Sequence, residues 1–176
     1  MMSIVYLFWM YVILFAIIGA MRGWAKELLV IFSAITALAV NMLMDKYIPL
    51  VRDLPDNSSS VFWIRTIILI SLVYFGYQTV TVVPRLASKA ARERLQDALF
   101  GAVVGGLNGY FIAGSILFYN HVAEYPYKNI ISPATDPAII QAIDTMMRYM
   151  PPRLIGEPGI YFAVIIILIF IIVVYI

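Results

Sequence analysis

Residues 3–44 read SIVYLFWMYVILFAIIGAM (3–21), RGWAKE (22–27) and LLVIFSAITALAVNMLM (28–44), which are two apolar stretches divided by a charged hexapeptide. A single helix through both stretches would be about 60 Å long, roughly twice the hydrocarbon thickness of a bilayer. The chain must therefore fold back, or leave the membrane, at Arg22-Gly23 and Lys26-Glu27. Ionisable groups in such a position are costly, and they mark either a turn or a functional site.

The composition of the whole chain is that of an integral membrane protein. Of its 176 residues, 63% are hydrophobic and only 12% are charged, and the mean hydropathy is +0.93. A soluble domain would be about half apolar and a quarter charged. The net charge of +2 comes from scattered basic residues and gives no support to nucleic-acid binding. The chain has no cysteine, which excludes disulfides and thiolate chemistry.

Five apolar segments have lengths close to that of a membrane-spanning helix. They cover about residues 3–21, 25–44, 61–83, 98–119 and 159–176. We therefore predict an all-α fold, a polytopic transmembrane helical bundle of about four core helices plus a C-terminal fifth. Residues 1–120 would form a four-helix membrane block, residues 121–158 an extracytoplasmic loop, and residues 159–176 a C-terminal transmembrane helix.

The loop of residues 121–158 contains one predicted amphipathic helix, over about 137–150. Asp136-Pro137 is typical of an N-cap followed by proline at the first helical position, and Pro151-Pro152 would end the element. The apolar residues of this stretch fall on one helical face: Ile139, Ile143, Met146, Met147 and Met150. Such a helix would lie on the outer membrane surface or cap the bundle.

Basic residues between the third and fourth segments indicate the topology. Arg85, Lys89 and Arg92 are spaced i, i+4 and i+7, so they would share one face of a short interfacial helix against anionic lipid headgroups. They would equally serve as a simple topology anchor. Together with Arg22 they favour a cytoplasmic location for these short connections, which puts the N-terminus outside and the C-terminus inside.

The fourth segment carries glycines at every fourth position, Gly101, Gly105 and Gly109. This spacing gives a flat helix face that another backbone can approach closely, either as ordinary helix packing or as a crossing that lines a path. Asn108 lies inside the segment, where we expect it to hydrogen-bond to a neighbouring helix. Asp97 precedes the segment, where its carboxylate would face the positive end of the helix dipole.

No catalytic, metal-binding or cofactor-binding constellation is recognisable. His121 is the only histidine, so neither a metal site of the usual kind nor a triad can form around it, and we expect a structural or interfacial role. We predict that the chain is not an enzyme.

The ordered motifs resemble the colicin V production protein (CvpA) family over about residues 4–120. They comprise Arg22-Gly23, Lys26-Glu27-Leu28, Asp97, Phe100-Gly101, Gly105 and Gly109. Members of that family typically have Arg-Gly late in the glycine-rich segment, where this chain has Asn108-Gly109. The resemblance implies a multi-pass protein of the bacterial inner membrane that is needed for production of a secreted peptide toxin.

Two functional hypotheses follow. The first is a non-enzymatic factor that supports toxin export or envelope homeostasis through a membrane-protein partner or as a homo-oligomer. The second is a small ion or proton channel or transporter that uses a charge cluster of Arg22, Glu27 and Asp97, together with Asn108. On a continuous helix Arg22 and Glu27 would point about 140° apart. They would pair only if Gly23 breaks the helix, and otherwise Asp97 is the expected partner of Arg22.

Overall fold

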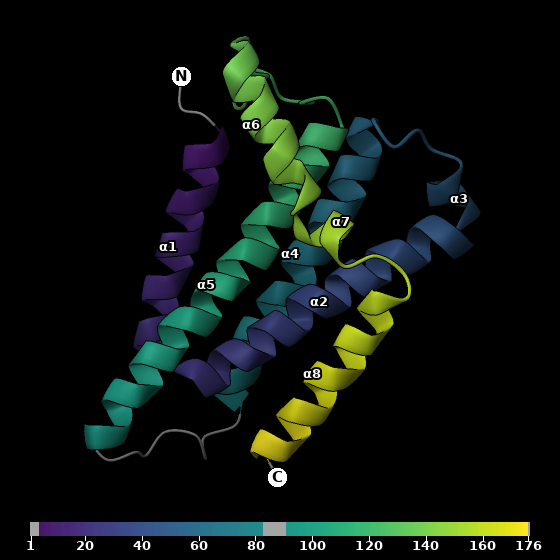
Figure 1. Ribbon diagram of the computed structural model, residues 1–176. Coiled ribbons are helices and arrows are strands. Elements are labelled where there is room, and N and C mark those ends of the chain that lie inside the picture. Colours follow the sequence, from purple (N-terminus) through teal and green to yellow (C-terminus); the bar gives the residue numbers. More distant parts are fainter. Residues whose placement is uncertain (1–3, 83–90, 176) are drawn as a thin grey trace.

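The computed structural model describes residues 4–82 and 91–175, and within those residues every regular element is a helix. Four helices are long and apolar enough to cross a membrane (Figure 1). They are α1 (Ile4–Arg22), α2 (Trp24–Tyr47), α4 (Ser59–Val82) and α5 (Ala91–Val122). These four helices match the first four apolar segments, and they confirm the all-helical membrane fold.

Four shorter helices complete the described part of the chain: α3 (Pro49–Arg52), α6 (Pro137–Arg148), α7 (Pro151–Leu154) and α8 (Gly159–Tyr175). The fifth apolar segment is α8, whose 17 residues would extend about 25 Å, close to the lower limit for crossing a bilayer. It packs against α2 with Ile160 fully buried, so it belongs to the bundle and is not a separate anchor.

The two ends of the bundle differ in what they contain. The start of α1, the end of α5 and α6 lie at one end, while the α1–α2 turn, the start of α5 and the end of α8 lie at the other (Figure 1). The chain termini are therefore at opposite ends, as the predicted N-out, C-in topology requires. Which end faces the cytoplasm stays a prediction from the basic residues.

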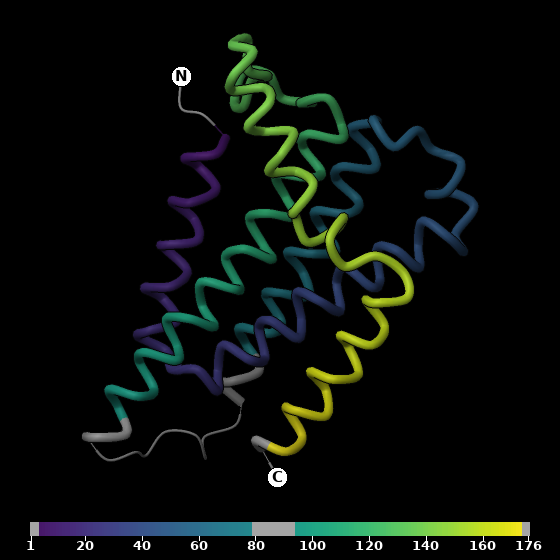
Figure 2. The backbone as a smooth tube through the Cα atoms, in the orientation of Figure 1, coloured from purple at the N-terminus to yellow at the C-terminus, as the bar shows by residue number. Residues whose placement is uncertain are grey.

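The closest helix pair is α1 and α5, whose backbones run side by side (Figure 2). A Cβ atom on Gly105 would lie 2.8 Å from Gly19 Cα, and one on Gly109 would lie 2.9 Å from Val12 Cα. Both distances are well inside van der Waals contact, so only glycine permits this approach. The glycine face of α5 is therefore occupied by α1 of the same chain.

A cysteine pair can test this register, because the chain has no native cysteine. A Cβ atom placed on Gly106 would lie 3.7 Å from Ala16 Cβ, close to the mean Cβ–Cβ separation of about 3.8 Å in disulfides. We expect Ala16→Cys with Gly106→Cys to form an intrachain disulfide in membranes, seen as a mobility shift reversed by a reducing agent. A pair moved one residue along α5, Ala16→Cys with Leu107→Cys, should cross-link far less; equal yields would contradict the helix register.

The core lies between α2, α4, α5 and α8. Its most deeply buried members include Val30, Ala34 and Ala37 on α2, Leu69 on α4 and Ile160 on α8. Small residues on α2 let the neighbouring helices pack closely, which matters because lipid tails are as apolar as these side chains and only close packing favours helix association. The outward faces of α1 and α8 expose large apolar side chains, as helices that face hydrocarbon do.

Helix α6 caps one end of the bundle, which is one of the two locations that the sequence left open. Asp136 is its N-cap, and the Asp136 carboxylate accepts a hydrogen bond of 2.8 Å from the Ala138 N–H. Ile143 and Met147 pack onto a small cluster that includes Phe8 of α1 and Leu117 of α5. The helix ends at Arg148 rather than near residue 150, and Ile139 at its start stays exposed.

Only the last part of the predicted interfacial helix before the fourth segment lies within the described residues. Arg85 and Lys89 lie outside the described residues. From Ala91 onward the chain is already part of α5, so residues 91–97, which include Arg92 and Asp97, are the first turns of a long membrane helix and not a separate element. The helix starts earlier than hydropathy indicates because Arg92, Glu93 and Arg94 favour helix although they are polar.

Candidate functional site

The α1–α2 turn is made by a single glycine. Gly23 has φ +88°, a conformation that residues with a side chain rarely adopt, and it separates the last residue of α1 from the first residue of α2. On a continuous helix the side chains of Arg22 and Glu27 would point about 140° apart, and the break at Gly23 removes this constraint. As a result Arg22 Nε lies 3.0 Å from Glu27 Oε1.

Glu27 is fully buried between α2 and α5. Asn108 Nδ2 donates hydrogen bonds to Glu27 Oε2, at 2.8 Å, and to the Glu27 backbone carbonyl, at 3.0 Å. The expected interhelical hydrogen bond of Asn108 is therefore present, and its acceptor is Glu27. A buried carboxylate needs such partners, because an ion taken out of water is otherwise strongly destabilising.

Arg22 links this carboxylate to α4. Its guanidinium carbon lies 4.2 Å from the centre of the Tyr77 ring, within the range of a cation–π contact. The Arg22 side chain remains 26% exposed, whereas that of Glu27 is 0% exposed. Although Arg22 Nε and Glu27 Oε1 are close, the N–H direction does not meet hydrogen-bond geometry, so the contact is an ion pair without a hydrogen bond at that nitrogen.

Asp97 of α5 lies against the same turn but has a different role from the one expected. Its carboxylate Oδ1 accepts a hydrogen bond of 3.2 Å from the Trp24 N–H, at the start of α2. A Cβ atom on Gly23 would lie 2.9 Å from Asp97 Cγ. Asp97 does face the positive end of a helix dipole, as predicted, but that helix is α2 and not its own. Of the two alternatives for Arg22, the structure has the one in which Gly23 breaks the helix and Arg22 pairs with Glu27, and not the pairing with Asp97.

We expect Asp97→Ala to lower the free energy of unfolding by about 0.5–2 kcal/mol, as loss of an N-cap does, because the start of α2 loses its acceptor. Reversible unfolding in mixed detergent micelles, followed by circular dichroism, measures this change. Asp97→Asn keeps an acceptor oxygen and should retain most of the stability. If the alanine variant is as stable as the native chain, Asp97 does not cap α2.

Lys26 and His121 stand apart from this cluster. Lys26 is half-buried in the first turn of α2 and makes no ion pair with a residue in the described ranges. His121 Nδ1 lies 3.0 Å from the Tyr125 hydroxyl, and His121 Nε2 lies 3.8 Å from Asp144 on α6. These contacts place the histidine at the junction of α5 with the capping helix.

A second polar cluster, at the other end of α2, is one that the sequence reasoning missed. Arg65 on α4 lies 2.8 Å from Asp45 on α2 and 2.8 Å from Asp56. Asn41 Nδ2 donates to the Arg65 carbonyl and to the Tyr119 hydroxyl, both at 3.2 Å. A lone arginine inside an apolar segment is itself a signal of a buried partner.

The two clusters bracket the apolar core of the bundle. Glu27 and Asp45 are eighteen positions apart on α2, which corresponds to about 27 Å along a helix and is close to the hydrocarbon thickness of a bilayer. Each cluster joins α2, α4 and α5. Their positions therefore suit the two edges of the hydrocarbon region, where ionised groups can be partly hydrated.

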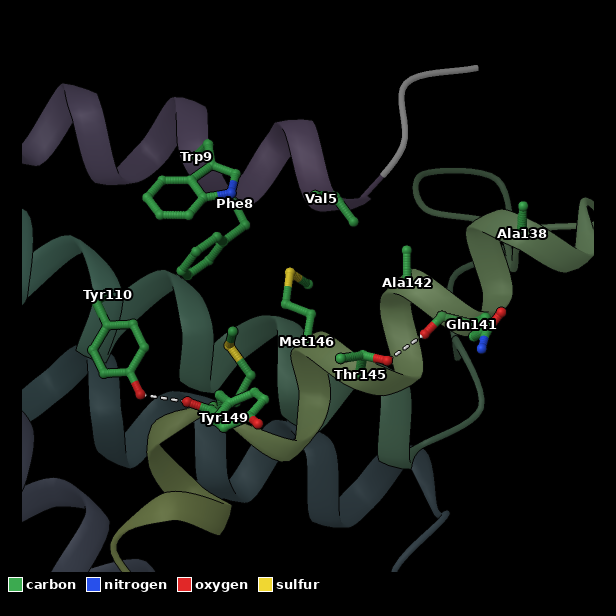
Figure 3. Close-up of a pocket in the computed structure, with 11 residues that line it drawn as sticks. Val5, Phe8, Trp9, Tyr110, Ala138, Gln141, Ala142, Thr145, Met146 and Tyr149 are labelled. Atoms are coloured by element: carbon green, nitrogen blue, oxygen red, sulfur yellow. Dashed lines mark hydrogen bonds between the residues drawn. The ribbon is translucent and has the colours of Figure 1, made fainter.

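A largely apolar pocket of about 700 Å³ opens between α1, α5 and α6 (Figure 3). Trp9 and Phe8 of α1 line one side, Tyr110 of α5 lies at its base, and α6 forms the other side. The Tyr110 hydroxyl donates to the Tyr149 carbonyl, and the Thr145 hydroxyl donates to the Gln141 carbonyl. The hydroxyl groups of Tyr110 and Thr145 are thus engaged in local hydrogen bonds, and the pocket lacks the charged residues of the two clusters.

Comparison with known proteins identifies the family. A family model described as "Colicin V production protein" matches residues 4–135. The match covers most of the chain, so the chain belongs to that family, as the motifs from Arg22 to Gly109 indicate. No curated protein and no solved structure matches it significantly. The match includes α1, α2, α4 and α5, and with them both polar clusters.

Proposed function

We propose that this member of the colicin V production protein family is a non-enzymatic factor of the bacterial inner membrane that supports toxin production or export, or envelope homeostasis, through membrane-protein partners. The observation that carries the proposal is the family match over residues 4–135.

The structure bears on which surface of the chain a partner protein could contact. The glycine face of α5 is already covered by α1, so it is not the contact surface for a second protein. The outward face of α1 is apolar and open, with Trp9, Ile13 and Met21 all more than half exposed. The outward faces of α1 and α8 are thus the apolar surfaces left for a membrane-protein partner or a second copy of the chain.

Complementation tests the proposal directly. A strain that secretes a colicin V-type peptide would lose secretion when the gene for this chain is deleted, and regain it when the chain is supplied. Secreted toxin is measured as growth inhibition of a sensitive strain, with the membrane level of the chain checked by immunoblotting. Normal toxin secretion in the deletion strain, together with no cross-linked protein partner, would contradict the proposal.

A small ion or proton channel or transporter is the second candidate, and the ion pair between half-buried Arg22 and fully buried Glu27 favours it. Intramembrane charges often lie on ion or proton paths. Flux through the purified chain in sealed liposomes distinguishes the candidates, with Glu27→Gln and Asp97→Asn beside the native chain. A flux lost in Glu27→Gln supports conduction, whereas tight vesicles throughout support the partner-binding role.

A further inference from the structure

Several buried polar atoms around Glu27 have no hydrogen-bond partner in the described part of the chain. Glu27 Oε1, Asn108 Oδ1 and the Tyr77 hydroxyl are buried atoms that make no hydrogen bond with the described residues. Glu27 and Asn108 are both fully buried. A buried acceptor without a donor is strongly unfavourable, so a site with these unpaired oxygens suits a ligand that supplies a hydrogen-bond donor.

Arg22 is held in this site less firmly than Asn108. It is the last residue of α1, it borders the glycine turn, and part of its side chain is exposed. The Arg22 Nε–H is not aligned on Glu27, whereas Asn108 donates to that carboxylate at 2.8 Å. A long arginine side chain at a helix end can extend to the headgroup region while its stem stays on apolar surface.

We propose that Glu27 is a proton-binding site. The proton and the Arg22 side chain are alternative partners of the Glu27 carboxylate, and each neutralises its charge when the other is absent. When Arg22 moves to the interface, a proton from water at the α1–α2 end forms an O–H bond on Glu27 Oε1, and Arg22 keeps its own charge. The buried site is neutral in both states, so neither leaves an uncompensated ion in the membrane. The new O–H supplies the donor that the unpaired oxygens lack.

The other charged and titratable groups around the site fit this exchange. Tyr77 on α4 is a neutral phenol under the Arg22 guanidinium. Asp97 on α5 is bound to the Trp24 N–H and does not pair with Arg22. Lys26, on the same helix as Glu27, makes no ion pair with a residue of the described part. Arg22 is thus the cation on which the ionised form of Glu27 depends.

The proposal goes beyond the function proposed above and does not rest on it. Its test uses the full chain in liposomes and N,N′-dicyclohexylcarbodiimide, an apolar reagent that reacts with protonated carboxyl groups. Labelling of Glu27, measured by mass spectrometry at neutral pH, should rise several-fold in Arg22→Met and stay at the native level in Arg22→Lys. The infrared spectrum of Arg22→Met should show a carboxylic-acid C=O band that is missing from Arg22→Met with Glu27→Gln.

A folded Arg22→Met chain without that band, or equal labelling in the methionine and lysine variants, overturns the proposal. Folding is checked with the Ala16–Gly106 cysteine pair. If Arg22→Met does not fold, the native chain is titrated instead, and the band should grow as the pH falls and be absent from Glu27→Gln. No such band in the native chain at any pH at which it stays folded overturns the proposal as well. These spectra are independent of toxin secretion, so the two proposals fail separately.

Discussion

Gly105→Ala should destabilise the chain by about 1–3 kcal/mol, the usual range for overpacking, whereas Gly106→Ala should be neutral or stabilising by up to about 1 kcal/mol. Both changes give α5 the same gain in helix propensity. They differ in what the new methyl group meets: at position 105 it would lie 2.8 Å from Gly19 Cα, and at position 106 it would lie 3.7 Å from Ala16 Cβ. The first contact involves backbone and cannot be relieved by a side-chain rotation.

The measurement is reversible unfolding in mixed micelles for both variants beside the native chain. In the Gly105 variants the α1–α5 contact is followed independently by disulfide formation between cysteines that replace Ala16 and Gly106. Gly105→Leu enlarges the clash and should abolish both the disulfide and toxin secretion. If Gly105→Ala and Gly106→Ala are equally stable, the close crossing of α1 and α5 is not what holds the two helices together.

Hydropathy and spacing predict the membrane helices well, because they are set by local composition. The first four segments appear as α1, α2, α4 and α5, and the N-cap at Asp136 begins α6 as expected. A helix that crosses the hydrocarbon region needs about 20 predominantly apolar side chains, and such a run can be recognised in a single sequence. The glycine spacing likewise indicates a close crossing, although it does not say which helix fills it.

Partners across the bundle could not be predicted in the same way. The role of Asp97 shows why. Its partner, the Trp24 N–H, is 73 positions away and belongs to the backbone, so no pattern of side chains in the sequence predicts this contact. Tyr77 gives no signal either, because an aromatic residue in an apolar helix is ordinary. Arg65 did give a signal, a lone charge within an apolar run, but only the fold shows that Asp45 and Asp56 are the groups it contacts.

The φ angle of Gly23 decides which of two partners, Asp97 or Glu27, Arg22 pairs with. With a continuous helix, Arg22 would have needed Asp97. With Gly23 at φ +88°, Arg22 reaches Glu27 on the next helix instead. The turn therefore brings together two of the three charges of the expected cluster, and it leaves Asp97 to cap α2.

A double-mutant cycle should find Arg22 coupled to Glu27 and not to Asp97. For Arg22→Met with Glu27→Gln we expect a coupling energy of about 0.5–3 kcal/mol, because each residue contacts the other and Arg22→Met removes the cation that stabilises the ionised form of Glu27. For Arg22→Met with Asp97→Asn the two effects should add to within about 0.5 kcal/mol, since Asp97 bonds to the Trp24 N–H. The free energy of unfolding of each single and double variant in mixed micelles gives both energies. Additivity in the Glu27 cycle, or a larger coupling in the Asp97 cycle, would show that Gly23 does not turn Arg22 toward Glu27 in the folded protein.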